Sequence, residues 1–143
     1  MSELYPQQSP KVEINNETHF FPEKKFNKSK IQKYSYPYDK IKNIINSAED
    51  DLESIVDTHV SVVGWIKTVR TQSNDAFAFC SLNDGSTHDC IQVIVNKEKE
   101  EIEGQFDDFY QNASTGASLR VAGTIVKSPA KGQLIELIAK NIL

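Results

Sequence analysis

Two phenylalanines, two positions apart, are residues whose types and spacing suit a binding function. The stretch AFAFCSL, residues 76–82, reads as a β-strand, in which Phe77, Phe79 and Ser81 share one face. The other face is small to apolar throughout and suits the interior of a barrel. Phe77 and Phe79 are therefore predicted to point outward. Either nucleic-acid bases, or a flanking helix or the N-terminal extension, would then cover the two rings.

Three polar residues on neighbouring predicted strands could contact a nucleic acid on these rings. Gln92 is expected outward and beside Phe79, and its amide offers a donor and an acceptor together. Arg70 closes the first strand, and its planar guanidinium can stack on a base or hold a phosphate. Glu136 could accept from a base amino group. The ordinary alternatives are a solvated glutamine, an ion pair from Arg70 to Asp75, and a surface glutamate.

Five short β-rich segments carry these residues, at positions 59–69, 75–82, 89–95, 117–126 and 134–142. Turn signals separate them, and residues 97–114 place Ile102, Phe106, Phe109 and Tyr110 at helical spacing. The predicted fold class is all-β with one inserted helix. Five strands with a helix after the third is the order of the OB-fold, a five-stranded Greek-key barrel. Any small five-stranded barrel or sandwich with an inserted helix fits the same pattern.

Residues 1–57 are predicted to form an N-terminal extension to a domain at residues 58–143. The first 22 residues contain three prolines, and up to about residue 38 there is no sustained apolar pattern. We expect that part to be largely extended or disordered until something binds it. Ser47 with Asp50 fits a capping box, which predicts a short helix near residues 47–56.

The net charge of -4 argues against a protein that binds nucleic acid by bulk electrostatics. The charge is unevenly distributed, with six acids and one lysine at residues 98–108 and seven lysines and one acid at residues 24–42. Five of these lysines are candidates for an auxiliary contact with a polyanion, and the alternative is a solvated tether. They are Lys24, Lys25, Lys28, Lys30 and Lys33.

Other classes of site have little support in the sequence. The two cysteines and three histidines do not have the spacing of metal ligands, so we expect no metal site. No apolar run approaches the roughly 18 residues of a membrane helix, and the first residues do not resemble a signal peptide. We therefore expect no membrane partner and a cytoplasmic location.

Four runs, taken in order, resemble the anticodon-binding domain of class IIb aminoacyl-tRNA synthetases. They are GWIKTVR (64–70), FAFCSLNDGS (77–86), IQVIV (91–95) and TGASLRVAGTIVKSPAKGQLIEL (115–137). The resemblance covers roughly residues 60–143. The NDGS turn and the KSPAKGQ connection are most similar to the asparagine-specific members, with the aspartate-specific members as the nearest alternative.

This resemblance implies a partner and a role for each candidate residue. The partner would be asparagine tRNA, with anticodon GUU. Phe79 would stack on the central uracil, Gln92 would hydrogen-bond it, and Arg70 would contact the same base or its phosphate. Glu136 would lie next to the anticodon pocket, and Phe77 has no role that the resemblance fixes. Some eukaryotic relatives carry basic N-terminal appendages that contact tRNA, which is one reading of the lysine-rich stretch.

The sequence also departs from the complete family pattern. It contains neither the phenylalanine-arginine-x-glutamate signature nor the glycine-rich, arginine-ending segment of a class II catalytic domain. We expect the chain to be inactive by itself and to be the front of a longer ligase. No cofactor is expected in this domain, while ATP and Mg²⁺ would serve the parent's catalytic domain, and the parent would be a homodimer. Two other functions stay open, a free-standing OB-fold that binds single-stranded nucleic acid and a barrel that serves protein contact.

Overall fold

The computed structural model describes residues 38–143, and the backbone of residues 12–14 and 17–19. The chain divides into two units, residues 1–35 and residues 36–143. The first contains an antiparallel pair of strands, β1 (Val12–Ile14) and β2 (Glu17–His19). Strands of three residues are too short to leave an alternating pattern in the sequence. The five candidate lysines of the extension lie outside the described residues.

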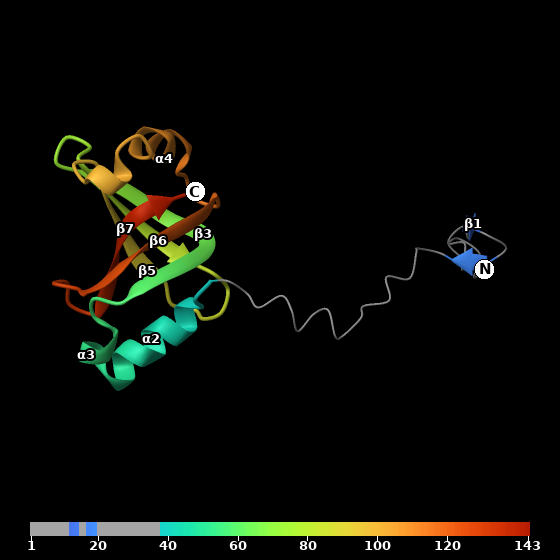
Figure 1. Ribbon diagram of the computed structural model, residues 1–143, viewed down its shortest axis with the longest axis horizontal. Helices are drawn as coiled ribbons and strands as arrows, with labels where there is room; N and C mark the ends of the chain where they lie inside the picture. Colours follow the sequence, from blue (N-terminus) through green and yellow to red (C-terminus); the bar gives the residue numbers. More distant parts are fainter. Residues whose placement is uncertain (1–11, 15–16, 20–37) are drawn as a thin grey trace, which may run out of the picture. The chain divides into compact units, whose positions relative to one another are not determined.

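The second unit is built on a closed barrel of five strands (Figure 1). The strands follow the order β3-β4-β5-β7-β6, and β6 pairs with β3 to close the barrel. All pairs are antiparallel except β5 with β7. This arrangement is the OB-fold that the sequence predicted. The strands are β3 (His59–Gln72), β4 (Phe77–Asn83), β5 (Ile91–Asn96), β6 (Ser118–Lys127) and β7 (Ile135–Ile142).

Alternating side chains of the strands fill the barrel. Ala78, Cys80 and Leu82 of β4 are fully buried, as are Val93 and Val95 of β5. Burial, with a smaller effect of the nearby Cys90, raises the pKa of the Cys80 thiol to about 12, so this thiol stays protonated. The inward set predicted from the sequence is therefore confirmed, and the alternate residues of β4 and β5 face outward.

Two short helices lie at one end of the barrel, η1 (Glu100–Ile102) and α4 (Phe106–Asn112) (Figure 1). Ile102, Phe106 and Phe109 are buried there, as the helical spacing predicted. Tyr110 is instead half exposed and stacks on Phe106, with ring centroids 6.1 Å apart. The acidic run of residues 98–108 is carried by these helices and the turns beside them.

The helix before the barrel does not begin at the capping box of Ser47 and Asp50. α2 spans Ile41–Asp50 and α3 spans Leu52–Ile55, so Ser47 lies inside a helix and not at its start. The backbone N–H of Ile41 donates to Asp84 Oδ2, 2.9 Å away, on the connection between β4 and β5. A carboxylate from a distant turn thus takes the place of a local cap. The buried face of α2, including Ile41 and Ile44, belongs to the hydrophobic core.

Candidate nucleic-acid interface

Cross-strand pairing arranges the outer face of the sheet in two neighbouring rows. One row is mostly apolar and runs through Arg70, Phe79, Ile94 and Ile138. The next is polar and runs through Thr68, Ser81, Gln92 and Glu136. A flat ring that lies on the first row would present its edge to hydrogen-bonding groups of the second. Four of the five residues predicted to form the site thus belong to two adjacent rows of one surface.

Arg70 and Phe79 form a direct contact. They are cross-strand partners of β3 and β4, and the guanidinium carbon lies 5.3 Å from the centroid of the ring. This distance is within the range of a cation–π contact. The expected alternative, an ion pair from Arg70 to Asp75, is not found among the residues that the structure describes. Arg70 is exposed, so its guanidinium remains accessible to a ligand.

Phe77 lies one row further along β4, between Gln72 of β3 and Asn96 of β5. It is half-buried, like Phe79. Both phenylalanines therefore project from the outer face, as predicted, and neither belongs to the fully buried core. Phe77 lacks an arginine partner, which distinguishes it from Phe79.

The sequence predicted Gln92 beside Phe79, and in the structure Gln92 lies directly opposite Ser81. Phe79 pairs with Ile94, so Gln92 is its diagonal neighbour. Diagonal side chains are about 7–8 Å apart at the backbone, still within the reach of a long side chain. The Gln92 amide makes no hydrogen bond to another residue in the described part of the chain, so its donor and acceptor are both available.

Glu136 is a buried carboxylate, only 5% exposed, and the surface alternative is wrong. Its Oε1 accepts from the hydroxyl of Ser128 at 2.8 Å and from the amide of Gln133 at 2.7 Å. Gln133 also donates to the Ser128 hydroxyl, so the three side chains form one network. Ser128 and Gln133 were not predicted as site residues, although both lie in the KSPAKGQ connection that carried part of the resemblance. The loop before β7 covers Glu136 and fixes its orientation.

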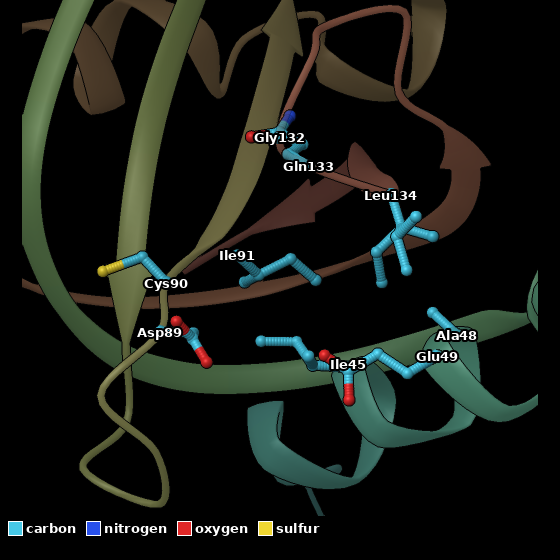
Figure 2. A pocket seen from close by; sticks show the side chains of 10 residues that line it. Ile45, Ala48, Glu49, Asp89, Cys90, Ile91, Gly132, Gln133 and Leu134 are labelled. Atoms are coloured by element: carbon cyan, nitrogen blue, oxygen red, sulfur yellow. The ribbon is translucent and has the colours of Figure 1, made fainter.

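The same loop also lines a cavity of about 210 Å³ (Figure 2). Figure 2 shows α2, with Ile45 and Ala48, on one side and the segment from Gly132 to Leu134 on the other. Asp89, Cys90 and Ile91 complete the lining at the start of β5. Gln133 lines this cavity and bonds to Glu136. The helix before the barrel therefore lies close to the loop that positions the site.

The described residues offer little for other kinds of chemistry. Within residues 38–143, no group of three or more His, Cys, Asp or Glu side chains is placed to hold a metal ion. In the same part of the chain, no helix is long and apolar enough to span a membrane. On the candidate surface, the guanidinium of Arg70 lies over the ring of Phe79. This combination can hold a base by stacking and a phosphate by charge.

The fold and this surface define a nucleic-acid-binding class. Residues 60–143 match the tRNA anticodon family, described as an OB-fold nucleic acid binding domain, and the chain belongs to that family. Over 93 residues it is 44% identical to the asparagine-tRNA ligase of Borreliella afzelii (strain PKo), covering 64% of this chain and 19% of that protein. The asparagine-tRNA ligase of Pasteurella multocida (strain Pm70) is 42% identical over 83 residues, covering 58% of this chain and 17% of that one.

A solved structure shares the fold at low sequence identity. Asparaginyl-tRNA synthetase from Pyrococcus horikoshii, in complex with asparaginyl-adenylate, matches with a TM-score of 0.57 and 16% identity, over 76% of this chain and 22% of that chain. The chain therefore spans about a fifth of the relatives that it matches.

Proposed function

We propose that this chain recognises the anticodon loop of asparagine tRNA, as the N-terminal part of an asparagine-tRNA ligase. The observation that carries the proposal is the pairing of Arg70 with Phe79 on the outer sheet face, beside the Gln92 amide, which makes no hydrogen bond to another described residue. The similarity to asparagine-tRNA ligases over the barrel supports the choice of tRNA. The anticodon would be GUU.

The two rows of the surface have different roles in recognition: the apolar row stacks on a base, and the polar row hydrogen-bonds its edge. Phe79 stacks on the central uracil, with Arg70 at the same base or its phosphate, and stacking of this kind contributes about 1–3 kcal/mol per base without regard to its identity. Gln92, one row away, offers both a donor and an acceptor to the edge of that base. Edge hydrogen bonds discriminate between bases, by about 1–3 kcal/mol per good pair in duplex readout. Anticodon loops suit this mode because their bases can splay out.

Glu136 supplies a fixed acceptor at the edge of the same surface. Both of its hydrogen bonds to described residues use Oε1. Its Oε2 is left to accept from a donor on the RNA, such as the exocyclic amino group of a base. The network with Ser128 and Gln133 holds the carboxylate in place before RNA binds, which lowers the entropy cost of recognition.

The lysine-rich stretch adds a contact without sequence preference. Lys24, Lys25, Lys28, Lys30 and Lys33 would approach the phosphates of the bound tRNA. These residues lie outside the described part of the chain, so the proposal rests on their charge and spacing alone. Phe77 would pack against the anticodon loop at the edge of the Phe79 platform.

Ligation itself is assigned to a separate catalytic domain. None of the class II signatures occurs in these 143 residues, so we assign the chain itself no catalytic step. ATP and Mg²⁺ would be used by the catalytic domain of the parent ligase, which we propose is a cytoplasmic homodimer.

The proposal can be tested by titrating the chain with an anticodon stem-loop that carries GUU. Two matched loops replace the central uracil with cytosine or end the triplet in cytosine, as in the aspartate anticodon. We expect binding to require the central uracil, and Phe79→Ala and Gln92→Ala each to weaken it. Lys140→Ala, on the exposed end of β7, is the control and should leave binding unchanged.

Each contrary outcome would point to a different function or to a lower specificity. Equal binding of GUU and GUC would mean that this domain does not itself separate asparagine from aspartate tRNA. Binding that ignores the central base and survives Gln92→Ala would indicate a general single-strand binder. If no loop binds, the surface is a protein contact and the proposal is wrong.

A further inference from the structure

A β-bulge changes which residues of β3 share the outer face. The register of β3 against β4 shifts between Ile66, which pairs with Leu82, and Thr68, which pairs with Ser81. Lys67 is the extra residue, and a bulge of this kind breaks the strict alternation of side chains. Trp65 and Arg70 are an odd number of positions apart, yet both are exposed. The outer edge of the sheet therefore carries Trp65 as well as the Arg70 and Phe79 pair.

Trp65 is a large aromatic side chain with 55% of its surface exposed. Its cross-strand partners, Asn83 of β4 and Ser118 of β6, are both polar. The tight turn at Gly85 comes near the ring, where an added Cβ would lie 4.0 Å from it. One exposed apolar residue is ordinary by itself. The lysines near Trp65, however, suggest that this residue binds a ligand that carries negative charge.

Two lysines lie in the vicinity of this tryptophan. Lys67 follows it in the bulge, is exposed and forms no ion pair with another described residue. Lys40 lines a shallow cavity together with Gly85, the glycine next to the ring. Asp84 lines the same cavity, but its carboxylate already accepts hydrogen bonds from Ile41 and Ser86. Neither lysine forms an ion pair with another described residue, and an aromatic ring with cations nearby suits a base with its flanking phosphates.

We propose that Trp65 is a second stacking platform, which takes a base of the same RNA loop outside the triplet. Lys67 and Lys40 would contact the phosphates on either side of that base. The inference rests on the proposed function, in which Phe79 takes the central base. A protein partner is disfavoured because the polar neighbours of Trp65 leave no contiguous apolar patch of the size that such partners bury.

The spacing along β3 shows that the two rings take different bases. Trp65 and Arg70 are five positions apart, but because of the bulge their partners Asn83 and Phe79 are only four positions apart. At about 3.3 Å per position, the Trp65 row lies roughly 13 Å from the Phe79 row. Stacked nucleotides rise only about 3.4 Å each, so one base cannot reach both rows. The RNA would therefore extend along the strand, and we place the base on Trp65 next to the triplet, on its 5′ or its 3′ side.

The chain contains a single tryptophan, so its intrinsic fluorescence reports on this residue alone. We expect the GUU stem-loop to quench that fluorescence, with the same midpoint as binding measured by the anisotropy of a labelled loop. Two further loops each lack one base, at the position before or after the triplet. One of them should still bind, with an affinity reduced between about fivefold and about a hundredfold, and should no longer quench.

Substitutions at position 65 test the same point through affinity. Trp65→Phe keeps a stacking ring and should retain most of the binding, whereas Trp65→Leu should lose between about fivefold and about a hundredfold. On the loop that lacks the stacked base, Trp65→Leu should cost nothing further. A thermal melt of each variant shows that the barrel is intact, and Lys140→Gln is the control for a remote surface change.

The results separate this inference from the proposed function. Phe79→Ala should weaken binding but preserve the quenching once RNA saturates the protein. If RNA binds through Phe79 while Trp65 fluorescence does not change, the second platform is wrong and the proposed function stands. The same holds if Trp65→Leu lowers affinity equally for every loop, because the tryptophan would then act only through the fold. If neither ring affects binding, both ideas fail.

Discussion

The contact between Arg70 and Phe79 shows why the type of cation matters at this position. A guanidinium is planar and can lie over a ring while its edge still binds an anion, whereas an ammonium is a point charge. The observed distance of 5.3 Å between the guanidinium carbon and the ring centroid fits such stacking. Arg70 therefore contacts the Phe79 ring, for which we propose stacking on a base, and also supplies charge.

The first prediction separates these two contributions. Arg70→Lys keeps the charge and should weaken binding of the GUU loop less than Arg70→Ala does. If the residue contacts a phosphate, the slope of log affinity against log salt should fall by about one for Arg70→Ala and stay nearly constant for Arg70→Lys. Affinities measured at several salt concentrations check this. Identical slopes for all three proteins would mean that Arg70 acts on the base and the ring alone.

At the scale of elements, the turn after β4 holds the helix before the barrel. Asp84 accepts from the Ile41 N–H and from both the N–H and the hydroxyl of Ser86. Burial, the largest single influence, raises the pKa of the Asp84 carboxyl, but these hydrogen bonds together outweigh it and hold the pKa below the usual value. The folded state therefore favours the charged carboxylate.

The second prediction concerns pH and follows from that direction. Because the pKa is lower in the folded protein, Asp84 stabilises it fully above the unfolded pKa of about 3.9, and the contribution is lost as pH falls through the folded value. Asp84→Ala should lower the free energy of unfolding by about 1 kcal/mol at pH 7, as losing a helix cap does. The variant and the native chain should converge in acid.

Urea unfolding at pH 7 and near pH 3 measures this difference. Asp50→Ala, at the exposed end of α2, is the matched control and should have little effect. A loss from Asp84→Ala that is equally large at both pH values would show that the charged form of the carboxylate is not what stabilises α2.

The pairing of β6 with β7 depends on one close backbone approach. The register shifts between Ala122 and Gly123, and a Cβ on Gly123 would lie 2.0 Å from the carbonyl oxygen of Ile138. No side chain fits there unless the strands move apart. The third prediction is that Gly123→Ala lowers the free energy of unfolding by about 1–3 kcal/mol or more. Urea unfolding measures this loss, with Lys140→Ala as the control. If Gly123→Ala leaves the free energy of unfolding unchanged, β6 and β7 can move apart at little cost and the prediction is wrong.

At the scale of the whole molecule, a net charge of -4 must be reconciled with the proposed binding to a polyanion. The acids at residues 98–108 lie with the helices at one end of the barrel, while Arg70 and Lys67 lie on the outer face of β3. A local surface of favourable charge can bind RNA although the total charge is negative. We expect the affinity to be modest and to fall with salt.

The fourth prediction tests the lysine-rich stretch. Changing Lys24, Lys25, Lys28, Lys30 and Lys33 together to Gln should weaken binding to full-length tRNA by the same factor for every anticodon, and should flatten the salt dependence. A control with Lys99 and Lys140 changed to Gln should do neither. If the quintuple variant instead alters the preference for GUU, the stretch takes part in recognition of the anticodon itself.

The sequence by itself determined the order of elements and the faces of the strands. Alternation in β4 and β5 placed Ala78 and Cys80 inward and Phe79 outward, and the helical spacing placed Phe106 and Phe109 in the core. These signals are local, because a pattern of period two or 3.6 lies within one segment of chain. The OB-fold could be predicted since the order of such segments is also a property of the sequence.

Only the tertiary structure decided how the segments fit together. Pairing register put Gln92 opposite Ser81, the loop before β7 buried Glu136, and the bulge at Lys67 brought Trp65 to the face of Arg70. The N-terminus of α2 is capped by Asp84, 43 positions away in the chain. Register, bulges and distant caps depend on which segments meet, and local patterns contain no information on that choice. The sequence could therefore nominate candidate residues such as Arg70, Phe79 and Gln92, whereas their geometry, and the network of Ser128 and Gln133 around Glu136, came only from the tertiary structure.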